Sequence, residues 1–244
     1  DIIYYIMFYI SQNCEEGTER KGFMTGNKSM VNGKPKINQD AMEGLNETQE
    51  LKIFYQRIMG IREETAVQEL AEHSELLKLK AKTILLKEND KVDRIHFLYK
   101  AGGIVKAYYD TRKGKKQIHC FAYLPGEPLV GIMNIDKNMT SFVTTELVTD
   151  CEIVSASADD IYRLSRESVD VALACTRMQG ISSIREFEYE KMILSYNPLE
   201  RYEYFVETYP EIVDKVSKKE IASYLNMTPE SLSRVLKKYK ELHG

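Results

Sequence analysis

Residues 217–244, SKKEIASYLNMTPESLSRVLKKYKELHG, decide the fold because they predict two short helices joined by a tight turn. Ser217 and Glu220 have the spacing of a capping box, in which the serine oxygen accepts the N3 amide and the glutamate accepts the serine amide. Asn226 follows a short apolar stripe, and asparagine tolerates the left-handed backbone that ends a helix. Residues 217–226 therefore predict the first helix and the start of the turn.

The second helix is predicted to have one apolar and one polar face. Thr228 is suited to cap it, and Pro229 then takes the first helical position, where a missing amide costs no hydrogen bond. The apolar face consists of Leu232, Val235, Leu236 and Tyr239. The outward face consists of Glu230, Ser233, Arg234, Lys237 and Lys238.

The chemistry of the outward face is that of a DNA-binding helix-turn-helix. An exposed arginine can bond guanine through two hydrogen bonds, a glutamate can accept from a cytosine amine, and lysines can neutralise phosphates. Residues 217–244 hold six basic against three acidic side chains, whereas the whole chain has a net charge of -3. Basic character is therefore concentrated in this segment. The pattern alone leaves open an ordinary helical hairpin with a solvated lysine face.

The run IASYLNMTPESLSRVLKK resembles the helix-turn-helix of the Crp/Fnr (cyclic-AMP receptor protein and fumarate-nitrate regulator) family of bacterial transcription regulators. In that family a Glu-x-x-Ser-Arg run opens the recognition helix and contacts DNA bases, as Glu230, Ser233 and Arg234 would here. The resemblance implies a dimer on a palindromic operator, with RNA polymerase as a further possible partner. The expected DNA-contacting residues are Glu230, Ser233, Arg234, Lys237, Lys238, Thr228 and Ser231. Family members continue into a β-hairpin wing, which is expected to be short or absent here.

Composition and cysteine spacing limit the other possibilities. The chain of 244 residues is 43% hydrophobic and 29% charged, as expected for a globular protein. Cys14, Cys120, Cys151 and Cys175 lie far apart without metal-binding spacing, which indicates free thiols in a reducing cytoplasm. Some relatives hold an iron-sulfur cluster through closely spaced N-terminal cysteines, but this region contains Cys14 alone. We therefore expect no metal and no cofactor.

The N-terminal residues 1–49 lie outside the resemblance and are expected to form an extension. The opening run DIIYYIMFYI is too short to span a bilayer and is preceded by no basic cluster, so it predicts neither a membrane helix nor a signal peptide. A strand or helix that packs on the body or on a partner is expected instead. Residues 11–49 are rich in Gly, Asn, Lys and Glu and predict an irregular connection.

The middle of the chain predicts a helical segment followed by a β-roll. Residues 51–77 have helical periodicity. Short β-type segments then follow, separated by turn residues: KTILLK, RIHFLYK, IVKAYYD, QIHCFAYL, SFVTTELV and CEIVSAS. Their spacing predicts a small antiparallel barrel or roll. LYKAGGIVKAYY and YLPGEPLVG resemble the sensor domain of the Crp/Fnr family, a cyclic-nucleotide-binding-like double-stranded β-helix, so residues 50–164 are expected to be that domain.

The sensor departs from the family at the nucleotide site. Members that bind cyclic nucleotides use a Gly-Glu pair and an arginine beside Ser or Thr, because a buried phosphodiester needs a guanidinium. Here the pair is Gly131-Ile132, and residues 138–146 contain no arginine. We therefore expect no cyclic-nucleotide binding. A different small-molecule effector is expected in a pocket formed by Gly131, Thr144, Tyr123 and Met178.

A haem is not expected either. His96 and His119, the candidate ligands, each lie within a strand pattern, where a core or surface histidine is the simpler interpretation. Aromatic side chains of the same strands could line a pocket, or could fill the interior of the roll.

Residues 165–196 predict one long helix, capped by Ser165 or Ser168 and ended by Asn197-Pro198. Its apolar stripe is broad: Val171, Ala174, Met178, Ile181 and Met192, widened by Leu173, Ile184 and Phe187. In the family this helix is the dimer axis, and the stripe is compatible with a coiled-coil seam. Packing within one chain remains the alternative. Residues 197–244 complete the DNA-binding domain.

The resulting prediction is an α+β protein with a β-roll, a long dimerisation helix and a C-terminal helix-turn-helix, acting as an effector-controlled transcription regulator. An enzyme is not expected, since we find no Gly-rich phosphate loop, no metal-spaced His/Cys set and no nucleophile elbow. The alternative is a ligand- or partner-binding module whose helix-turn-helix no longer binds DNA.

Overall fold

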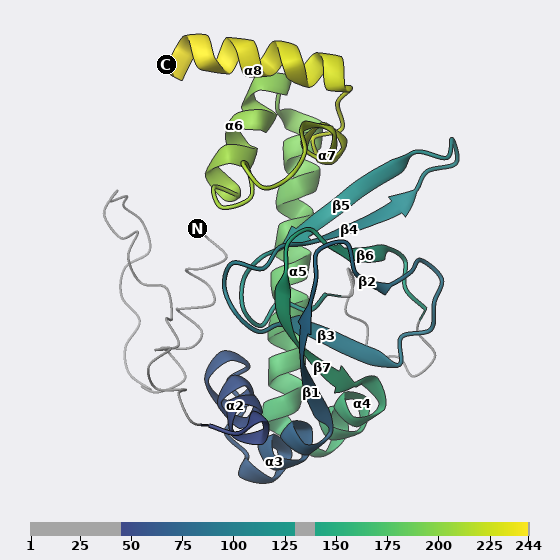
Figure 1. The fold of residues 1–244 in the computed structure, drawn as a ribbon, viewed down its shortest axis with the longest axis vertical. Coiled ribbons are helices and arrows are strands. Elements are labelled where there is room, and N and C mark those ends of the chain that lie inside the picture. Colours follow the sequence, from purple (N-terminus) through teal and green to yellow (C-terminus); the bar gives the residue numbers. More distant parts are fainter. Residues whose placement is uncertain (1–44, 130–139, 244) are drawn as a thin grey trace.

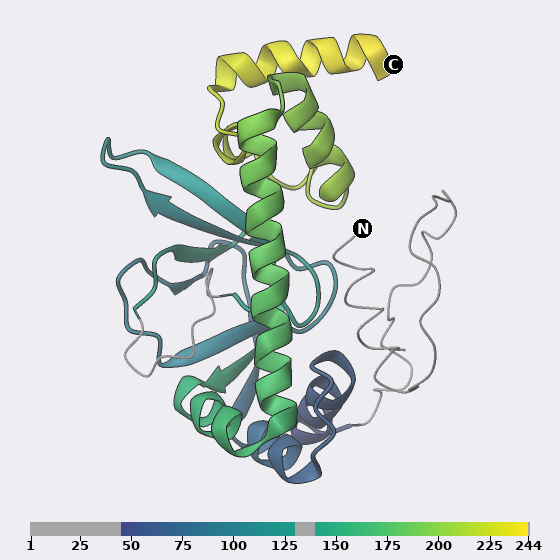
Figure 2. The ribbon, with the colours of Figure 1, turned by 180° about the vertical axis from the view of Figure 1, so that it is seen from behind.

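The computed structural model describes residues 45–129 and 140–243 (Figure 1). The long helix α5 (Val169–Ser195) extends through most of the length of the molecule. The strands lie along one side of α5, and helices gather at both of its ends (Figures 1 and 2). The expected apolar opening run, the irregular connection as far as residue 44, and Gly131 lie outside the described residues.

The described chain starts with helix α2 (Glu47–Ile53), which Asn46 caps through a complete capping box with Gln49. A π-helical turn, η2 (Phe54–Ile58), and helix α3 (Glu64–Glu72) follow. The predicted helical segment is wrong at its end, because strand β1 (Ser74–Leu79) begins there. Leu76 and Leu77 pair with Val154 and Ile153 of a strand far along the chain, and this pairing overrides the local helical periodicity.

Two antiparallel sheets form the roll, with strand orders β1-β7-β3 and β2-β6-β4-β5. All six predicted β-type segments contain a strand, and β1 is the additional one. The strands after β1 are β2 (Ile84–Leu86), β3 (Arg94–Leu98), β4 (Val105–Asp110), β5 (Lys116–Ala122), β6 (Thr144–Leu147) and β7 (Cys151–Ser157). The roll predicted from strand spacing is thereby confirmed.

The long helix predicted over residues 165–196 is α5, and only residues 165–167 belong to a separate helix, α4 (Ala158–Glu167). Ser168 has an extended backbone, with φ -116° and ψ 121°, and its hydroxyl accepts a hydrogen bond from the amide of Val171 at 3.4 Å. Ser168 is therefore the cap, and Ser165 lies inside α4. The break turns the chain from α4 into α5.

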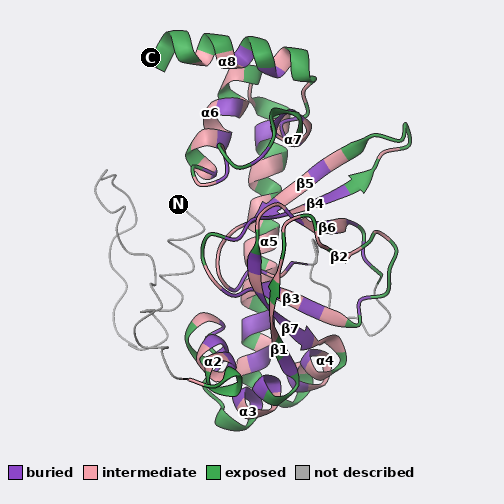
Figure 3. Cartoon of the chain, in the orientation of Figure 1, coloured by how far each residue is buried: buried purple, intermediate pink, exposed green. Residues whose placement is uncertain are grey.

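The faces of α5 differ from the predicted stripe. Val171, Ala174 and Met192 are buried against their own chain, so this part of the stripe packs within the protomer. Leu173 and Phe187, which belong to the predicted stripe, remain exposed, as do Val169 and Leu194. Figure 3 shows how buried, intermediate and exposed residues are distributed over the fold.

The C-terminal unit consists of α6 (Pro198–Thr208), α7 (Lys218–Tyr224) and α8 (Pro229–His243). A cluster of aromatic rings joins it to strand β5: Phe121 lies 5.6 Å from Tyr224 and 6.2 Å from Phe205, measured between ring centroids. The roll and the C-terminal unit therefore share one hydrophobic core. None of the helices in the described ranges is long and apolar enough to cross a membrane.

Candidate nucleic-acid interface

The helix-turn-helix has the local geometry that its sequence predicts. The Ser217 hydroxyl accepts from the Glu220 amide at 3.3 Å, and the Glu220 carboxylate accepts from the Ser217 amide at 2.9 Å, which completes the capping box. Asn226 adopts the left-handed backbone at φ +52°. The amide of Met227 then donates to the carbonyl of Ala222 at 2.8 Å, which closes the turn.

The N-terminus of α8 is also capped as predicted. The Thr228 hydroxyl accepts a hydrogen bond from the amide of Ser231 at 3.1 Å, and Pro229 is the first helical residue. Leu232 and Val235 face the interior and are 1% and 8% exposed. Burial of these two side chains fixes which face of α8 points to solvent.

Five of the predicted DNA-contacting side chains lie on the outward face of α8 and are exposed: Glu230, Ser233, Arg234, Lys237 and Lys238. Thr228 is exposed too, and Ser231 is half-buried. A guanidinium nitrogen of Arg234 lies 3.3 Å from the Ser231 hydroxyl oxygen, to which it donates. The basic face is thus open to a partner rather than packed on the body of the protein.

Glu230 is held in its ionised form. A hydrogen bond from its own backbone amide lowers the pKa of the Glu230 carboxyl, and the Thr228 hydroxyl and the charges of Arg234 and Lys115 lower it further. A carboxylate at this place can accept from a cytosine amine, while Arg234 one turn later can donate to guanine. The first two turns of α8 therefore present one acceptor and one donor group.

Helix α7 is anchored to the edge strand of the roll. The Ile118 amide donates to the Ser223 hydroxyl at 2.9 Å, and that hydroxyl donates to the Lys116 carbonyl at 3.2 Å. Lys106 of β4 bridges Glu220 of α7 at 2.7 Å and Glu146 of β6 at 2.9 Å. The sequence did not reveal these contacts, because those to α7 join residues about a hundred positions apart.

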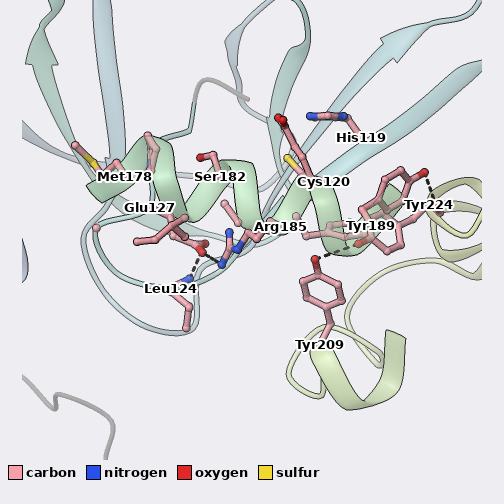
Figure 4. A pocket seen from close by; sticks show the side chains of 16 residues that line it. His119, Cys120, Leu124, Glu127, Met178, Ser182, Arg185, Tyr189, Tyr209 and Tyr224 are labelled. Atoms are coloured by element: carbon pink, nitrogen blue, oxygen red, sulfur yellow. Dashed lines mark hydrogen bonds and ion pairs between the residues drawn. The ribbon is translucent and has the colours of Figure 1, made fainter. Parts of the chain in front are cut away.

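A cavity lies where strand β5, the loop after it and helix α5 meet Tyr209 and Tyr224 (Figure 4). Arg185 forms an ion pair with Glu127 inside it. Glu127 is only 6% exposed, and its carboxylate also accepts the amides of Tyr123 at 2.7 Å and Leu124 at 3.0 Å. The charged groups at the centre of this cavity are thus already paired.

The predicted effector residues are only partly brought together. Met178 lines the cavity, but Tyr123 and Thr144 do not belong to its wall. The Tyr123 hydroxyl donates to the Thr208 carbonyl at 3.1 Å, and the Thr144 hydroxyl accepts from the Glu88 amide at 3.1 Å. Sequence reasoning missed Arg185 and Glu127, whose pairing has no local signal.

The neutral groups of the cavity wall are kept neutral by burial. Burial raises the pKa of the Cys120 thiol to about 12 and lowers the pKa of His119, the latter partly offset by the charge of Glu186. Cys120 is therefore an unreactive thiol at neutral pH. The wall is mainly apolar and aromatic around one closed ion pair.

One cluster of potential metal ligands occurs among the described residues: Glu69, His73 and Asp160. The guanidinium of Arg163 bonds to both Glu69 and Asp160, so a cation of the protein already neutralises the two carboxylates. We do not assign a metal to this cluster.

Comparison with known proteins gives matches in structure but not in sequence. No family model matches the chain, and no curated protein matches it either. The fold, in contrast, is similar to many solved structures.

Several of these structures have a TM-score above 0.5, among them the following three. A Crp/Fnr-family protein from Eubacterium rectale has a TM-score of 0.61 at 13% identity, covering 76% of this chain and 87% of its own. CLP, the c-di-GMP-responsive global regulator of Xanthomonas campestris, has 0.60 at 16% identity, covering 72% and 91%. A CRP-family transcriptional regulator from Thermus thermophilus has 0.54 at 14% identity, covering 68% and 85%. The chain therefore has the fold of Crp/Fnr-type regulators, in agreement with the resemblance of its helix-turn-helix.

Proposed function

We propose that this protein is a homodimeric, sequence-specific DNA-binding transcription regulator of the Crp/Fnr type, with α8 as its recognition helix. The observation that carries this proposal is the outward face of α8, where Glu230, Ser233 and Arg234 are exposed at the N-terminal end of a capped helix. In helix-turn-helix proteins the N-terminal residues of the second helix contact base edges in the major groove. A cytoplasmic location follows from the proposed partner.

The proposed dimer forms along the outer seam of α5, which we define as the exposed residues Val169, Leu173, Phe187 and Leu194 with the smaller residues between them. Val169, Phe187 and Leu194 are 74%, 63% and 75% exposed. Thr176, Gly180 and Ser183 complete the alternating spacing of three and four residues between Leu173 and Phe187. These positions have the heptad spacing of a coiled coil, with small residues in the middle and large apolar residues toward both ends, and a second α5 would cover them.

Such a dimer explains why the operator should be a palindrome. A twofold axis along α5 relates two copies of α8, and two recognition helices can enter successive major grooves when they lie about 34 Å apart. Lys237 and Lys238, one turn beyond Arg234, would then neutralise phosphates. RNA polymerase is a further candidate partner of a dimer bound to a promoter.

An effector site is proposed at the cavity beside Met178. The cavity touches β5, α5 and the two tyrosines of the C-terminal unit, Tyr209 and Tyr224, so an occupant could favour one placement of α8 over another. The guanidinium in its wall, that of Arg185, is paired with Glu127. A cyclic phosphodiester would have to displace that carboxylate, which supports an effector other than a cyclic nucleotide.

Selection of duplexes from a randomised library tests the proposed function. We expect the protein to enrich a palindromic sequence and to bind it as two protomers per duplex, measured by sedimentation. Phe187→Glu should shift the protein to monomer and abolish this stoichiometry, whereas Glu186→Gln, at a neighbouring exposed position, should not. Recovery of no consensus sequence would favour the alternative of a ligand- or partner-binding module.

A further inference from the structure

The tip of the β4–β5 hairpin, residues 111–116, is strongly basic and rigidly built. The Thr111 amide donates to the Lys115 carbonyl at 2.9 Å, and the Gly114 amide donates to the Thr111 carbonyl at 2.8 Å. Gly114 has φ +67°, as required at the last position of a three-residue hairpin loop. Arg112 and Lys113 therefore occupy the central positions of the turn, where side chains point to solvent.

Three cations at this tip are exposed and form no ion pair within the described ranges: Arg112, Lys113 and Lys115. Lys116 differs from them, because its ammonium donates to the Tyr108 hydroxyl at 3.0 Å and lies 4.2 Å from the centroid of that ring. Like charges gathered on one turn repel each other unless an anion binds to them. The tip thus has the character of an anion-binding surface.

The hairpin tip is held beside the N-terminal end of α8. Lys116, the last residue of the tip, and Ile118, two residues further on, are bonded to Ser223 of α7, the helix that precedes the recognition helix. Both views show the hairpin extending on the side where α8 begins (Figures 1 and 2). The pKa of the Glu230 carboxyl is lowered mainly by a hydrogen bond from its own backbone amide, and the charge of Lys115 lowers it further. Lys115 therefore lies near the first turn of α8.

We propose that the tip cations Arg112, Lys113 and Lys115 bind backbone phosphates of the duplex next to the bases that α8 contacts. This inference rests on the proposed function of α8. The major groove is about 12 Å wide, so a cation beside the first turn of a helix in the groove comes close to the bordering phosphates. Phosphate contacts fix position and carry no sequence information themselves.

The alternative partner is an acidic protein surface. DNA is favoured because the tip is fixed to the helix-turn-helix itself through Ser223, so the tip and α8 must face the same partner together. The tip would provide phosphate contacts from the sensor domain, in addition to those proposed for Lys237 and Lys238.

The test compares two triple variants with the wild type. Arg112→Gln/Lys113→Gln/Lys115→Gln removes the tip cations, whereas Arg57→Gln/Lys78→Gln/Arg166→Gln removes three exposed cations from η2, β1 and α4 in the other half of the molecule (Figure 1). The probes are a labelled duplex selected by the wild type and a scrambled duplex of the same length. Fluorescence anisotropy gives the dissociation constants from 50 to 300 mM salt, and thermal unfolding confirms that both variants fold.

The tip variant should bind both duplexes at least tenfold more weakly at near-physiological salt, with an unchanged ratio between them. The slope of log K against log salt should fall by about 1 for each cation that contacts a phosphate, while the control variant keeps the wild-type slope. Wild-type binding by the tip variant, as a protein partner would give, overturns the inference. So does an equal loss in both variants. Absence of any preference by the wild type instead contradicts the proposed function itself.

Discussion

Charged side chains are paired at the junction between the roll and the C-terminal unit, whereas those on the outer surface of α8 are exposed to solvent. At the junction, Arg185 is paired with Glu127, and Lys106 is paired with Glu146 and Glu220. On the outer surface, Lys237 and Lys238 are exposed and form no ion pair within the described part of the chain. The two surfaces are joined by the short helix α7.

This difference separates charges that hold the protein together from charges that are available to a partner. When one member of a partly buried ion pair is removed, the other charge is left uncompensated, and the folded protein becomes less stable. An exposed cation contributes little to the stability of the fold, because solvent screens its charge. Its removal is expected to lower the affinity for an anionic partner instead. Each of the following experiments tests whether a residue stabilises the fold or binds a partner.

Arg185→Ala should have the largest effect on stability. It leaves the buried Glu127 carboxylate without its guanidinium, and we expect a loss of about 3 to 5 kcal/mol in the free energy of unfolding, measured with urea. The double variant Glu127→Gln/Arg185→Met removes both charges and should recover most of this loss. A single variant as stable as the wild type would show that the pair is dispensable.

His96 should make the stability depend on pH. Burial, with the charge of Arg94, lowers the pKa of His96 from 6.5 to about 4, and its Nδ1 atom is buried without a hydrogen-bond partner. The unfolded chain takes up this proton near pH 6.5 and the folded chain only near pH 4. The contribution of neutral His96 to the free energy of unfolding is therefore fully present above pH 6.5. As the pH falls from 6.5 toward 4, the protein loses about 3 kcal/mol of stability from this group.

Replacement of His96 by Gln should remove this part of the pH dependence, measured by urea unfolding at several pH values between 7 and 4. His73→Gln, at an exposed histidine, is the matched control and should retain it. If His96→Gln and the wild type lost stability in parallel, the acid sensitivity would arise from other groups.

Ser217→Ala should have a smaller effect, because it removes the cap of α7 while leaving the core intact. The helix loses the bond from the Glu220 amide, and we expect about 1 kcal/mol less stability in thermal unfolding. Ser217→Asn retains a capping side chain and should restore nearly all of it. Equal melting temperatures of the alanine variant and the wild type would exclude a role of the cap.

Lys237→Ala should leave stability almost unchanged and act on DNA binding alone. If Lys237 contacts a phosphate, the variant binds all sequences more weakly and its salt slope falls by about 1, measured by anisotropy titrations. Arg57→Ala, which removes an exposed cation of η2, should change neither quantity. An altered preference between sequences would mean that Lys237 contacts bases instead.

The sequence predicted the helix-turn-helix well because its determinants are local. Ser217, Asn226 and Thr228 act on backbone groups within four residues of themselves, so caps and turn could be predicted from spacing. The positions of six strands along the chain could be predicted because turn residues separate short β-type runs, whereas their order in the two sheets could not.

The remaining features depend on contacts that no short pattern encodes. Strand β1 exists because β7 pairs with it, and the outer seam of α5 could be separated from the buried stripe only once the roll occupied one side of the helix. The cavity is formed where Glu127 meets Arg185, 58 positions later in the chain. The effector residues were therefore the least predictable part.

The measurement that tests the central claim most directly is the affinity of the wild type and of Arg234→Ala for a selected palindromic duplex and for its scrambled counterpart, by fluorescence anisotropy at near-physiological salt. We expect the wild type to prefer the palindrome by about a thousandfold. Arg234→Ala should lose about 1 to 3 kcal/mol of binding to the palindrome and little to the scrambled duplex. Equal, weak binding of both duplexes by the wild type, or unchanged preference in Arg234→Ala, would contradict the assignment of α8 as the recognition helix.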